Sequence, residues 1–450
     1  MTSILVTPHD ADLHIKACAL LCDLGSFEDA VGAGLVATGL APRNACAQGE
    51  LGRALVLAGH LDDALSTCAL ATSLAPRNVG ILVTFGAALF ALGHIEAALD
   101  TAADAVAIDP GQFQARANLA LALEAVGRLD EAEYQSRRAL TGVPDSFAGQ
   151  HNLAGLRLSR GLLDAESWRL YEARFGMTTQ SALIGQVPRW TGADISGQTM
   201  LLHAEQGYGD TIQFARYAPM VKARGARVIL AVAPPLIRLM QTLDGVDQVV
   251  AAGSLPPFDV FCPLASLPGV FDTRLETIPA GIPYLTAGPV AAGENRRLSS
   301  PRLQVGLAWA GNPGFIHDRA RSIDAAEFRG LAEVAGVDFH SLQKDSQPPF
   351  PMSDRMAEMT DFADTAALIA GLDLVITVDT AVAHLAGALG KPVWLLSRFL
   401  GCWRWLKDRS DSPWYPTMRI FRQQRQGGWA PVLAAVRSEL ANLSVQAGPD

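Results

Sequence analysis

Residues 92–110 read LGHIEAALDTAADAVAIDP, and this stretch decides the fold of the first third of the chain. A glycine near its start is followed by an alanine-rich helical run, and a proline closes it. Glycine supplies a tight turn and proline stops a helix. Residues 126–144, VGRLDEAEYQSRRALTGVP, follow the same plan 34 residues later. We therefore expect each unit to hold a turn and a helix, preceded by a partner helix.

The same spacing extends in both directions from this stretch. The periodic glycines are Gly25, Gly59, Gly93, Gly127 and Gly161, and the periodic prolines are Pro42, Pro76, Pro110 and Pro144. A fixed period of this length indicates stacked helical hairpins. The pattern resembles the tetratricopeptide repeat, with about five copies in a domain at 1–176. Such stacks usually bind a peptide or partner protein on a concave face, so we expect a protein partner there. A spacer or a homo-oligomerisation module is the alternative.

Composition limits the class of protein. The chain has 450 residues, of which 49% are hydrophobic and 18% charged, which is typical of a globular protein with two or three domains. A net charge of −9 argues against nucleic acid or an anionic membrane as the main partner. The sequence has neither signal-peptide features nor an apolar run long enough to span a membrane, so we expect a cytoplasmic location. The six cysteines show neither paired nor zinc-binding spacing, so we expect no structural metal.

Beyond the repeats, short apolar runs alternate with helical stretches. Residues 177–197 are rich in glycine and proline and are expected to form a junction. The expected strands of a first half, 198–290, are 199–204, 226–232 and 258–263, with a helix at 210–225. Those of a second half, 302–450, are 303–310, 337–342, 373–378 and 392–397, with helices at 325–335, 364–372 and 380–390. A polar linker is expected at 291–302. The predicted fold class is an α-helical solenoid followed by two α/β halves with parallel sheets, facing each other across a cleft.

Ligands of open α/β sheets bind where strands end and loops lead into helices. The first such loop, AEQGYGD, occupies residues 204–210. Its glycines, Gly207 and Gly209, permit a tight turn, and Asp210 stands at the entrance to the next helix. A carboxylate there could take a proton from an acceptor hydroxyl. A helix cap is the alternative for Asp210.

Two further loops of this kind lie in the second half. In WAGNPGFIHDRARSI, residues 309–323, Asn312 lies in the turn, and Arg321 could hold a diphosphate through charge-assisted hydrogen bonds. A solvated loop with surface ion pairs is the alternative. In VDTAVAHLAGALGKP, residues 378–392, Asp379 and Thr380 end a strand and open a helix, whose first N–H groups and dipole can receive a phosphate. For His384, a hydrogen bond to a neighbouring carbonyl is the alternative.

The segments GYGD, residues 207–210, and VDTAVAHLAGALGKP, about 170 residues further on, resemble the two signature ends of a glycosyltransferase family. The family has the GT-B fold and is of the ADP-heptose:lipopolysaccharide heptosyltransferase type. The resemblance covers roughly residues 198–440. Joined to tetratricopeptide repeats, it is similar to a bacterial group of repeat-linked glycosyltransferases, some of which glycosylate proteins, flagellin among them.

The resemblance assigns roles to particular residues. Asp210 takes the place of the general base near the acceptor, and Arg321 that of a donor-binding lysine. The donor diphosphate motif corresponds to Asp379, Thr380, Ala381, Val382 and His384. Ala381 stands where the family commonly has glycine, and arginine replaces lysine, so the identity of the donor is open.

The resemblance also implies an inverting displacement on a nucleotide-sugar substrate, without metal or other cofactor. Asn312 joins the donor residues, and the expected acceptor or sugar pocket consists of Gln206, Gly207, Tyr208, Gly209 and Trp403. Core packing is the alternative for Trp403. Three functions are open: transfer to a protein recruited by the repeats, transfer to lipopolysaccharide or another glycan, and a non-catalytic scaffold.

Overall fold

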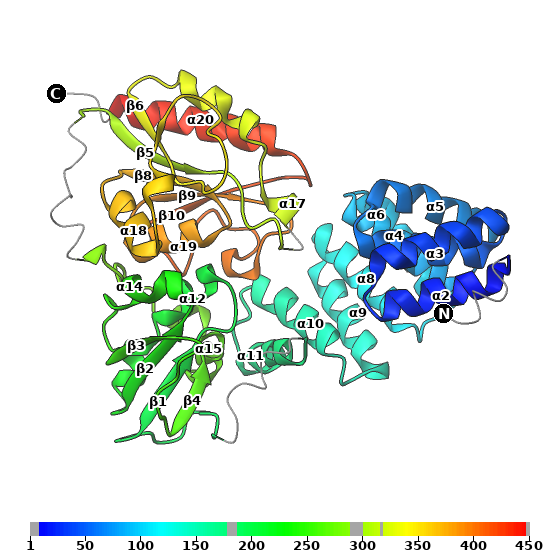
Figure 1. Cartoon of the computed structure of the whole chain (residues 1–450), viewed down its shortest axis with the longest axis horizontal. Helices are drawn as coiled ribbons and strands as arrows, with labels where there is room; N and C mark the ends of the chain where they lie inside the picture. The colour runs from blue at the N-terminus through cyan, green and yellow to red at the C-terminus, as the bar shows by residue number, and fades with distance from the viewer. Residues whose placement is uncertain (1–8, 178–186, 289–299, 316–317, 447–450) are drawn as a thin grey trace. The chain divides into compact units, whose positions relative to one another are not determined.

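The computed structural model describes residues 9–177, 187–288, 300–315 and 318–446 (Figure 1). The chain forms two compact units, Met1–Leu156 and Arg157–Asp450. Parts of the predicted junction at 177–197 and of the predicted linker at 291–302 lie outside the described residues. Residues 157–176 follow the repeat pattern in sequence but pack within the second unit.

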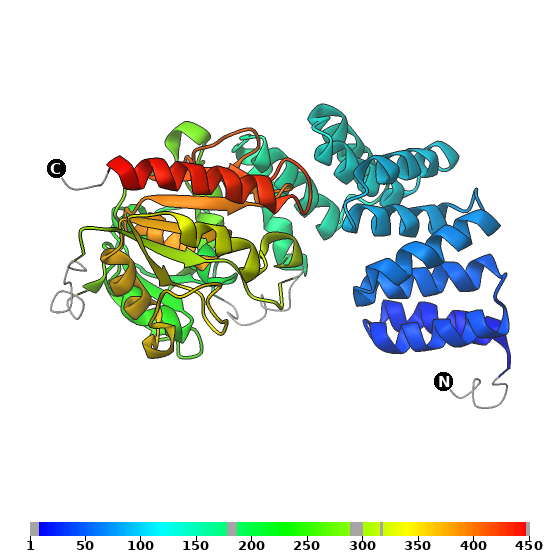
Figure 2. The same cartoon turned by 90° about the horizontal axis from the view of Figure 1, so that it is seen from above.

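The first unit consists of stacked helical hairpins (Figure 2). Its helices are α2 (Ala11–Asp23), α3 (Phe27–Leu40), α4 (Ala45–Ala58), α5 (Leu61–Leu74), α6 (Val79–Ala91), α7 (Ile95–Ile108), α8 (Phe113–Ala125), α9 (Leu129–Gly142) and α10 (Phe147–Ser159), the last crossing the boundary between units. Every periodic glycine has a left-handed backbone, with φ between 79° and 84°, as the turn requires. A side-chain carbon at Gly52 would lie 2.5 Å from Cys68 Sγ, so this helix contact needs a residue without a side chain. The predicted helical repeat is confirmed.

The second unit begins with α11 (Ala165–Tyr171) and the 3₁₀ helix η1 (Glu172–Met177), followed by two parallel sheets. The first sheet has the order β3-β2-β1-β4, with β1 (Thr199–His203), β2 (Arg227–Val232), β3 (Gln248–Ala251) and β4 (Val260–Pro263). The second has the order β10-β9-β8-β5-β6-β7, with β5 (Leu303–Ala308), β6 (Val337–Ser341), β7 (Ser353–Asp354), β8 (Leu374–Val378), β9 (Val393–Ser397) and β10 (Met418–Arg422). All paired strands are parallel, which confirms two α/β halves.

Most helices of this unit are short, and α20 with its 18 residues is the exception. Those of the first half are α12 (Tyr208–Ala215), α13 (Ala218–Lys222), η3 (Pro234–Leu236), α14 (Ile237–Met240), η4 (Leu264–Ser266), α15 (Leu267–Val270) and η5 (Leu275–Thr277). Those of the second half are α17 (Asp318–Arg321), η6 (Ala325–Glu333), η7 (Met356–Glu358), α18 (Phe362–Ala370), α19 (Ala381–Ala388), η8 (Trp403–Trp405) and α20 (Trp429–Gln446). The core of the second half includes Val432, Val436 and Leu440 of α20 together with strand residues such as Val305 and Ile376. Helix α20 lies along this sheet (Figure 2).

Several predicted boundaries were wrong. The helix expected at 210–225 breaks into α12 and α13, because Pro219 has no N–H to continue the hydrogen-bond ladder. The helix expected at 325–335 is the 3₁₀ helix η6. Strands β3, β7 and β10 and helix α20 were not predicted. The sequence of β10 is MRIFR, and its arginines hid the strand pattern.

Among the described residues, no helix has the length and apolarity needed to cross a membrane.

Candidate functional site

The first turns of α12 and α19 lie against each other, although the helices come from different halves of the second unit. Each helix follows the carboxyl end of a strand, β1 or β8. A side-chain carbon at Gly209 would lie 2.7 Å from His384 Cδ2 and 3.4 Å from the Cα atom of Ala381. Only glycine therefore permits this approach. The contact brings Asp210, the residue after Gly209, close to the start of α19.

Asp210 has both carboxylate oxygens held while part of the side chain stays accessible. Its Oδ2 accepts a hydrogen bond from the Gly207 N–H at 3.0 Å, which caps α12. Its Oδ1 pairs with Arg404 Nη2 at 2.6 Å. The side chain is 28% exposed. The capping role and the accessible carboxylate, posed as alternatives from the sequence, therefore coexist.

The start of α19 lacks a side-chain cap. Thr380 occupies the N-cap position with an extended backbone, but its side chain makes no capping hydrogen bond. Its hydroxyl lies instead 3.4 Å from the Thr377 hydroxyl. In α18, by contrast, Asp361 accepts hydrogen bonds from the N–H groups of the first turn. The N–H groups of Ala381 and Val382 are thus left uncapped by Thr380, as a phosphate site requires.

Arg321 is fixed beside this helix start. Its Nη1 donates to the Asp379 carbonyl at 2.9 Å, and its Nε donates to Asp318 Oδ1 at 2.9 Å. The guanidinium lies 4.6 Å from the centroid of the Phe315 ring. A side chain at Gly311 would overlap it. These contacts tie the loop after β5 to the loop after β8 and hold a cation near the first turn of α19.

The neighbouring polar residues order the same loops. Asn312 Oδ1 accepts a hydrogen bond from the Gly314 N–H at 2.9 Å, so it shapes the turn after β5.

Burial raises the pKa of the Asp379 carboxyl, against the lowering effects of the Trp405 indole and of the Arg404 guanidinium. Asp379 therefore has a stronger tendency than an exposed aspartate to hold a proton.

His384 is buried between the two halves. Its Nδ1 lies 3.0 Å from the Tyr415 hydroxyl, and its ring packs on Trp405 at a centroid distance of 5.1 Å. Burial lowers the pKa of His384 well below its ordinary value, and the charges of Arg404 and Arg216 act in the same direction. The ring is therefore neutral at pH 7 and brings no positive charge to the start of α19.

The predicted pocket residues differ in their surroundings. Gln206 hydrogen-bonds the Tyr171 hydroxyl through Nε2 at 3.2 Å. Tyr208 is 43% exposed and packs edge-on against Phe362. Trp403, in contrast, is only 8% exposed and packs against other aromatic rings, namely Trp168, Tyr171, Phe214 and Trp414. The Trp403 ring is therefore part of the core, which was the alternative posed from the sequence, and its place in a sugar pocket stays a prediction.

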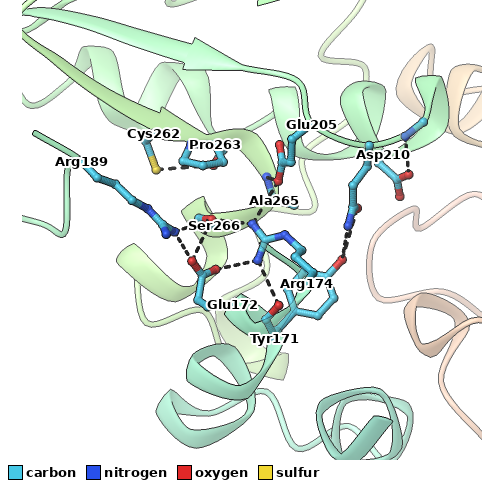
Figure 3. Close-up of polar contacts among 12 residues, drawn as sticks. Tyr171, Glu172, Arg174, Arg189, Glu205, Asp210, Cys262, Pro263, Ala265 and Ser266 are labelled. Atoms are coloured by element: carbon cyan, nitrogen blue, oxygen red, sulfur yellow. Dashed lines mark hydrogen bonds and ion pairs between the residues drawn. The ribbon is translucent and has the colours of Figure 1, made fainter. Parts of the chain in front are cut away.

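Two features of the site were missed in the sequence. The first is Arg404, which no motif includes. The second is the segment of α11 and η1, which was assigned to the repeats but borders the carboxyl ends of β1 and β4 (Figure 3). The tryptophans clustered near Arg404 in the sequence could have drawn attention to this segment, but they do not reveal that Arg404 pairs with Asp210.

The contacts of η1 with the first sheet centre on Arg174 (Figure 3). Its Nη2 donates to Glu205 Oε1 at 3.0 Å and to Ser266 Oγ at 2.6 Å. Its Nη1 donates to Glu172 Oε1 at 2.7 Å, and Glu172 also pairs with Arg189. Since Glu205 follows β1 and Ser266 follows β4, η1 holds together the loops that precede α12 and follow β4.

A cavity of about 620 Å³ lies elsewhere, beside the start of β5.

Comparisons with known proteins bear on the second half and on the chain as a whole. Residues 351–396, which include β8, α19 and most of β9, match the model of glycosyltransferase family 9 (heptosyltransferase). The chain is 27% identical over 318 residues to Protein FlbA of Caulobacter vibrioides. That match covers 62% of this chain and 52% of FlbA, so the chain spans about half the length of this curated relative.

Two solved structures of repeat proteins are similar to part of the chain. The tetratricopeptide-repeat protein TTC0263 of Thermus thermophilus is 23% identical, with a TM-score of 0.35, over 38% of this chain and 94% of that protein. YrrB, a tetratricopeptide-repeat protein with an unusual peptide-binding site, is 20% identical, with a TM-score of 0.30, over 40% and 93% of the two chains. The chain thus combines stacked helical hairpins with a second unit in which residues 351–396 are similar to glycosyltransferase family 9.

Proposed function

We propose that the second unit is a GT-B glycosyltransferase that moves a sugar from a nucleotide-sugar donor to an acceptor hydroxyl. The observation that carries this proposal is the contact between the starts of α12 and α19 at Gly209. It brings an accessible carboxylate of one half close to an uncapped helix start of the other. The match to glycosyltransferase family 9 includes that helix start.

The proposed reaction is a single inverting displacement. Asp210 takes the proton of the acceptor hydroxyl while the hydroxyl oxygen attacks the anomeric carbon, and the bond from that carbon to the diphosphate breaks. The departing nucleoside diphosphate gains negative charge, which the N–H groups of Ala381 and Val382 and the Arg321 guanidinium stabilise. The helix start and the arginine supply the positive potential that a metal ion would supply, so the mechanism is metal-independent. We expect Tyr208, which is exposed two residues before Asp210, to contact the acceptor.

The proposed acceptor is a serine or threonine hydroxyl of a flagellin-like protein that the repeats recruit. The distribution of charge supports a protein partner. Met1–Leu156 contain 17 acidic and 8 basic residues, so the repeat unit carries the whole net charge of −9 and the second unit is neutral. The partner surface is accordingly basic, and binding weakens as salt is added.

A glycan acceptor is the second candidate, because the description of the matched family includes heptosyltransferase. Deletion of residues 1–156 distinguishes the two acceptors. This deletion ends at the boundary of the units, whereas deletion of 1–176 would also remove α11 and η1. If the acceptor is a protein, the shortened chain loses transfer to protein but still hydrolyses the donor. If it is a glycan, transfer is retained.

Thermal unfolding with a panel of nucleotides tests donor binding. A ligand that binds the native state alone raises the unfolding midpoint, by an amount equivalent to about 2.7 kcal/mol at 100 times its Kd. UDP, GDP, ADP and CMP, and sugars linked to each, form the panel. Stabilisation by at least one of them, reduced in Arg321→Ala and retained in Asp210→Asn, is the expected result. A scaffold without activity would show neither stabilisation nor release of nucleotide.

A further inference from the structure

Arg404 is a buried cation whose donors converge on groups around Asp210. It lies in η8, in the second half, whereas Asp210 lies in the first. Its Nη2 pairs with Asp210 Oδ1 at 2.6 Å, and its Nε donates to Gln213 Oε1 at 2.6 Å, one turn further along α12. Its Nη1 lies 3.1 Å from Cys402 Sγ. The guanidinium therefore contacts α12 at two residues, Asp210 and Gln213.

The orientation of this guanidinium is fixed by rings. It lies 4.5 Å from the Trp403 centroid and 5.4 Å from the Phe214 centroid. The Tyr171 hydroxyl lies 3.5 Å from Nη2, so α11 also contributes to the surroundings. Burial acts to lower the pKa of Arg404, but the raising effects of Asp210, Cys402 and Tyr171 together outweigh it, and the pKa lies well above its ordinary value. The planar guanidinium of arginine can donate hydrogen bonds to several of these groups at once. A lysine ammonium would be a point charge on a flexible chain and could not hold the same geometry.

The two partners of the ion pair differ in exposure. The Arg404 side chain is 9% exposed and that of Asp210 is 28%. With Oδ1 paired to the buried Arg404 and Oδ2 held by the exposed Gly207 N–H, the carboxylate is fixed at both oxygens and stays partly accessible. An ion pair that served packing alone would not need this asymmetry. Fixed orientation matters for proton transfer, since a misplacement of about 1 Å can cost about 100-fold in rate.

We infer that Arg404 is a positioning residue that orients the Asp210 carboxylate for proton transfer. The inference rests on the proposed role of Asp210 as the base. Because Arg404 comes from the other half, the base is correctly oriented only while the two halves are together. Tyr171 supports the same arrangement, since its hydroxyl contacts both Gln206 and Arg404.

The test uses the full-length chain and the nucleotide sugar from which the wild type releases nucleotide fastest among UDP-, GDP-, ADP- and CMP-linked sugars. The variants are Arg404→Ala, Arg404→Lys, Asp210→Asn and the double variant Arg404→Ala/Asp210→Asn. Arg238→Ala is the matched control, because Arg238 also joins the halves, through Asp361 and Asp364 at 3.1 Å, but does not touch the site. The measurements are kcat and KM for nucleotide release and the thermal stabilisation by the matching free nucleotide.

We expect Arg404→Ala to lower kcat about 100-fold, with KM for the donor and stabilisation by nucleotide unchanged within about twofold. In the Asp210→Asn background the same substitution should have no further effect on kcat, because Arg404 acts through Asp210. Arg404→Lys should retain an intermediate rate, and added guanidinium should partly restore Arg404→Ala. Arg238→Ala should match the wild type.

Three results would overturn the inference alone: an unchanged kcat in Arg404→Ala, loss of nucleotide binding in that variant, or an equal loss of rate in the Asp210→Asn background. If Arg404→Ala does not fold, Arg404→Lys carries the test, and a wild-type rate for Arg404→Lys then overturns the inference. Absence of nucleotide release by the wild type from every donor would overturn the proposed function and this inference with it.

Discussion

Substitution of Gly209 by alanine tests the contact on which the site depends. The new methyl carbon would lie 2.7 Å from His384 Cδ2, whereas carbon atoms in ordinary contact are about 3.5–4.0 Å apart. His384 cannot retreat, because its other side packs on Trp405 and its Nδ1 bonds the Tyr415 hydroxyl. The helices must therefore separate by roughly 1 Å. Overpacking of this kind costs about 1–3 kcal/mol, and the displacement of Asp210 should lower activity about 100-fold.

Urea unfolding of Gly209→Ala measures the loss of stability, and nucleotide release from the preferred donor measures the loss of activity. Gly253→Ala is the control, because a side-chain carbon at Gly253 would meet no atom within 4 Å. A Gly209→Ala protein with wild-type stability and wild-type activity would show that the two helix starts do not need their close contact.

Four further outcomes are expected. Asp210→Asn should lower transfer by about 100-fold to 10,000-fold while calorimetry shows nucleotide binding intact; a loss of binding would contradict the role as base. Arg321→Ala should weaken binding of the nucleoside diphosphate about 10-fold to 100-fold by calorimetric titration, since it removes a charge-assisted contact, and Arg321→Lys should lose less. Burial lowers the pKa of His203 to about 4, so the unfolded chain takes up a proton that the native state excludes. Its contribution to stability is present above about pH 6.5 and is lost as pH falls toward 4, by at most about 1.4 kcal/mol per pH unit, and urea unfolding of His203→Gln should show a shallower pH dependence. A chain that starts at residue 157 should unfold cooperatively, whereas one that starts at residue 177 should be aggregated or unfolded in size-exclusion and circular dichroism measurements, because it lacks Arg174 and exposes the rings around Trp403.

The repeat fold could be predicted from sequence because each turn depends on a single local residue. A left-handed turn needs glycine, and all five periodic glycines adopt that conformation. The start of α19 was predictable for a similar reason, since strand, polar pair and helix follow one another directly from residue 374 to residue 388.

The remainder of the site depends on residues far apart in the chain. Arg404 contacts Gln213 and Asp210, which are about 190 residues away in the chain. Local sequence patterns do not predict contacts over such a separation. Trp168 looks like a repeat residue by its spacing, yet its indole donates to the Thr273 carbonyl at 2.7 Å, within the second unit. The break at Pro219 was readable in the sequence, but the apolar period across 210–225 concealed it.

The most direct test of the central claim is nucleotide release by the full-length chain from a panel of UDP-, GDP-, ADP- and CMP-linked sugars, measured beside Asp210→Asn. Release from at least one donor by the wild type, with a loss of about 100-fold or more in Asp210→Asn and equal nucleotide binding by both proteins, is the predicted result. Equal rates of release by the two proteins, or no binding and no release with any donor, would contradict a transferase site at the junction of α12 and α19.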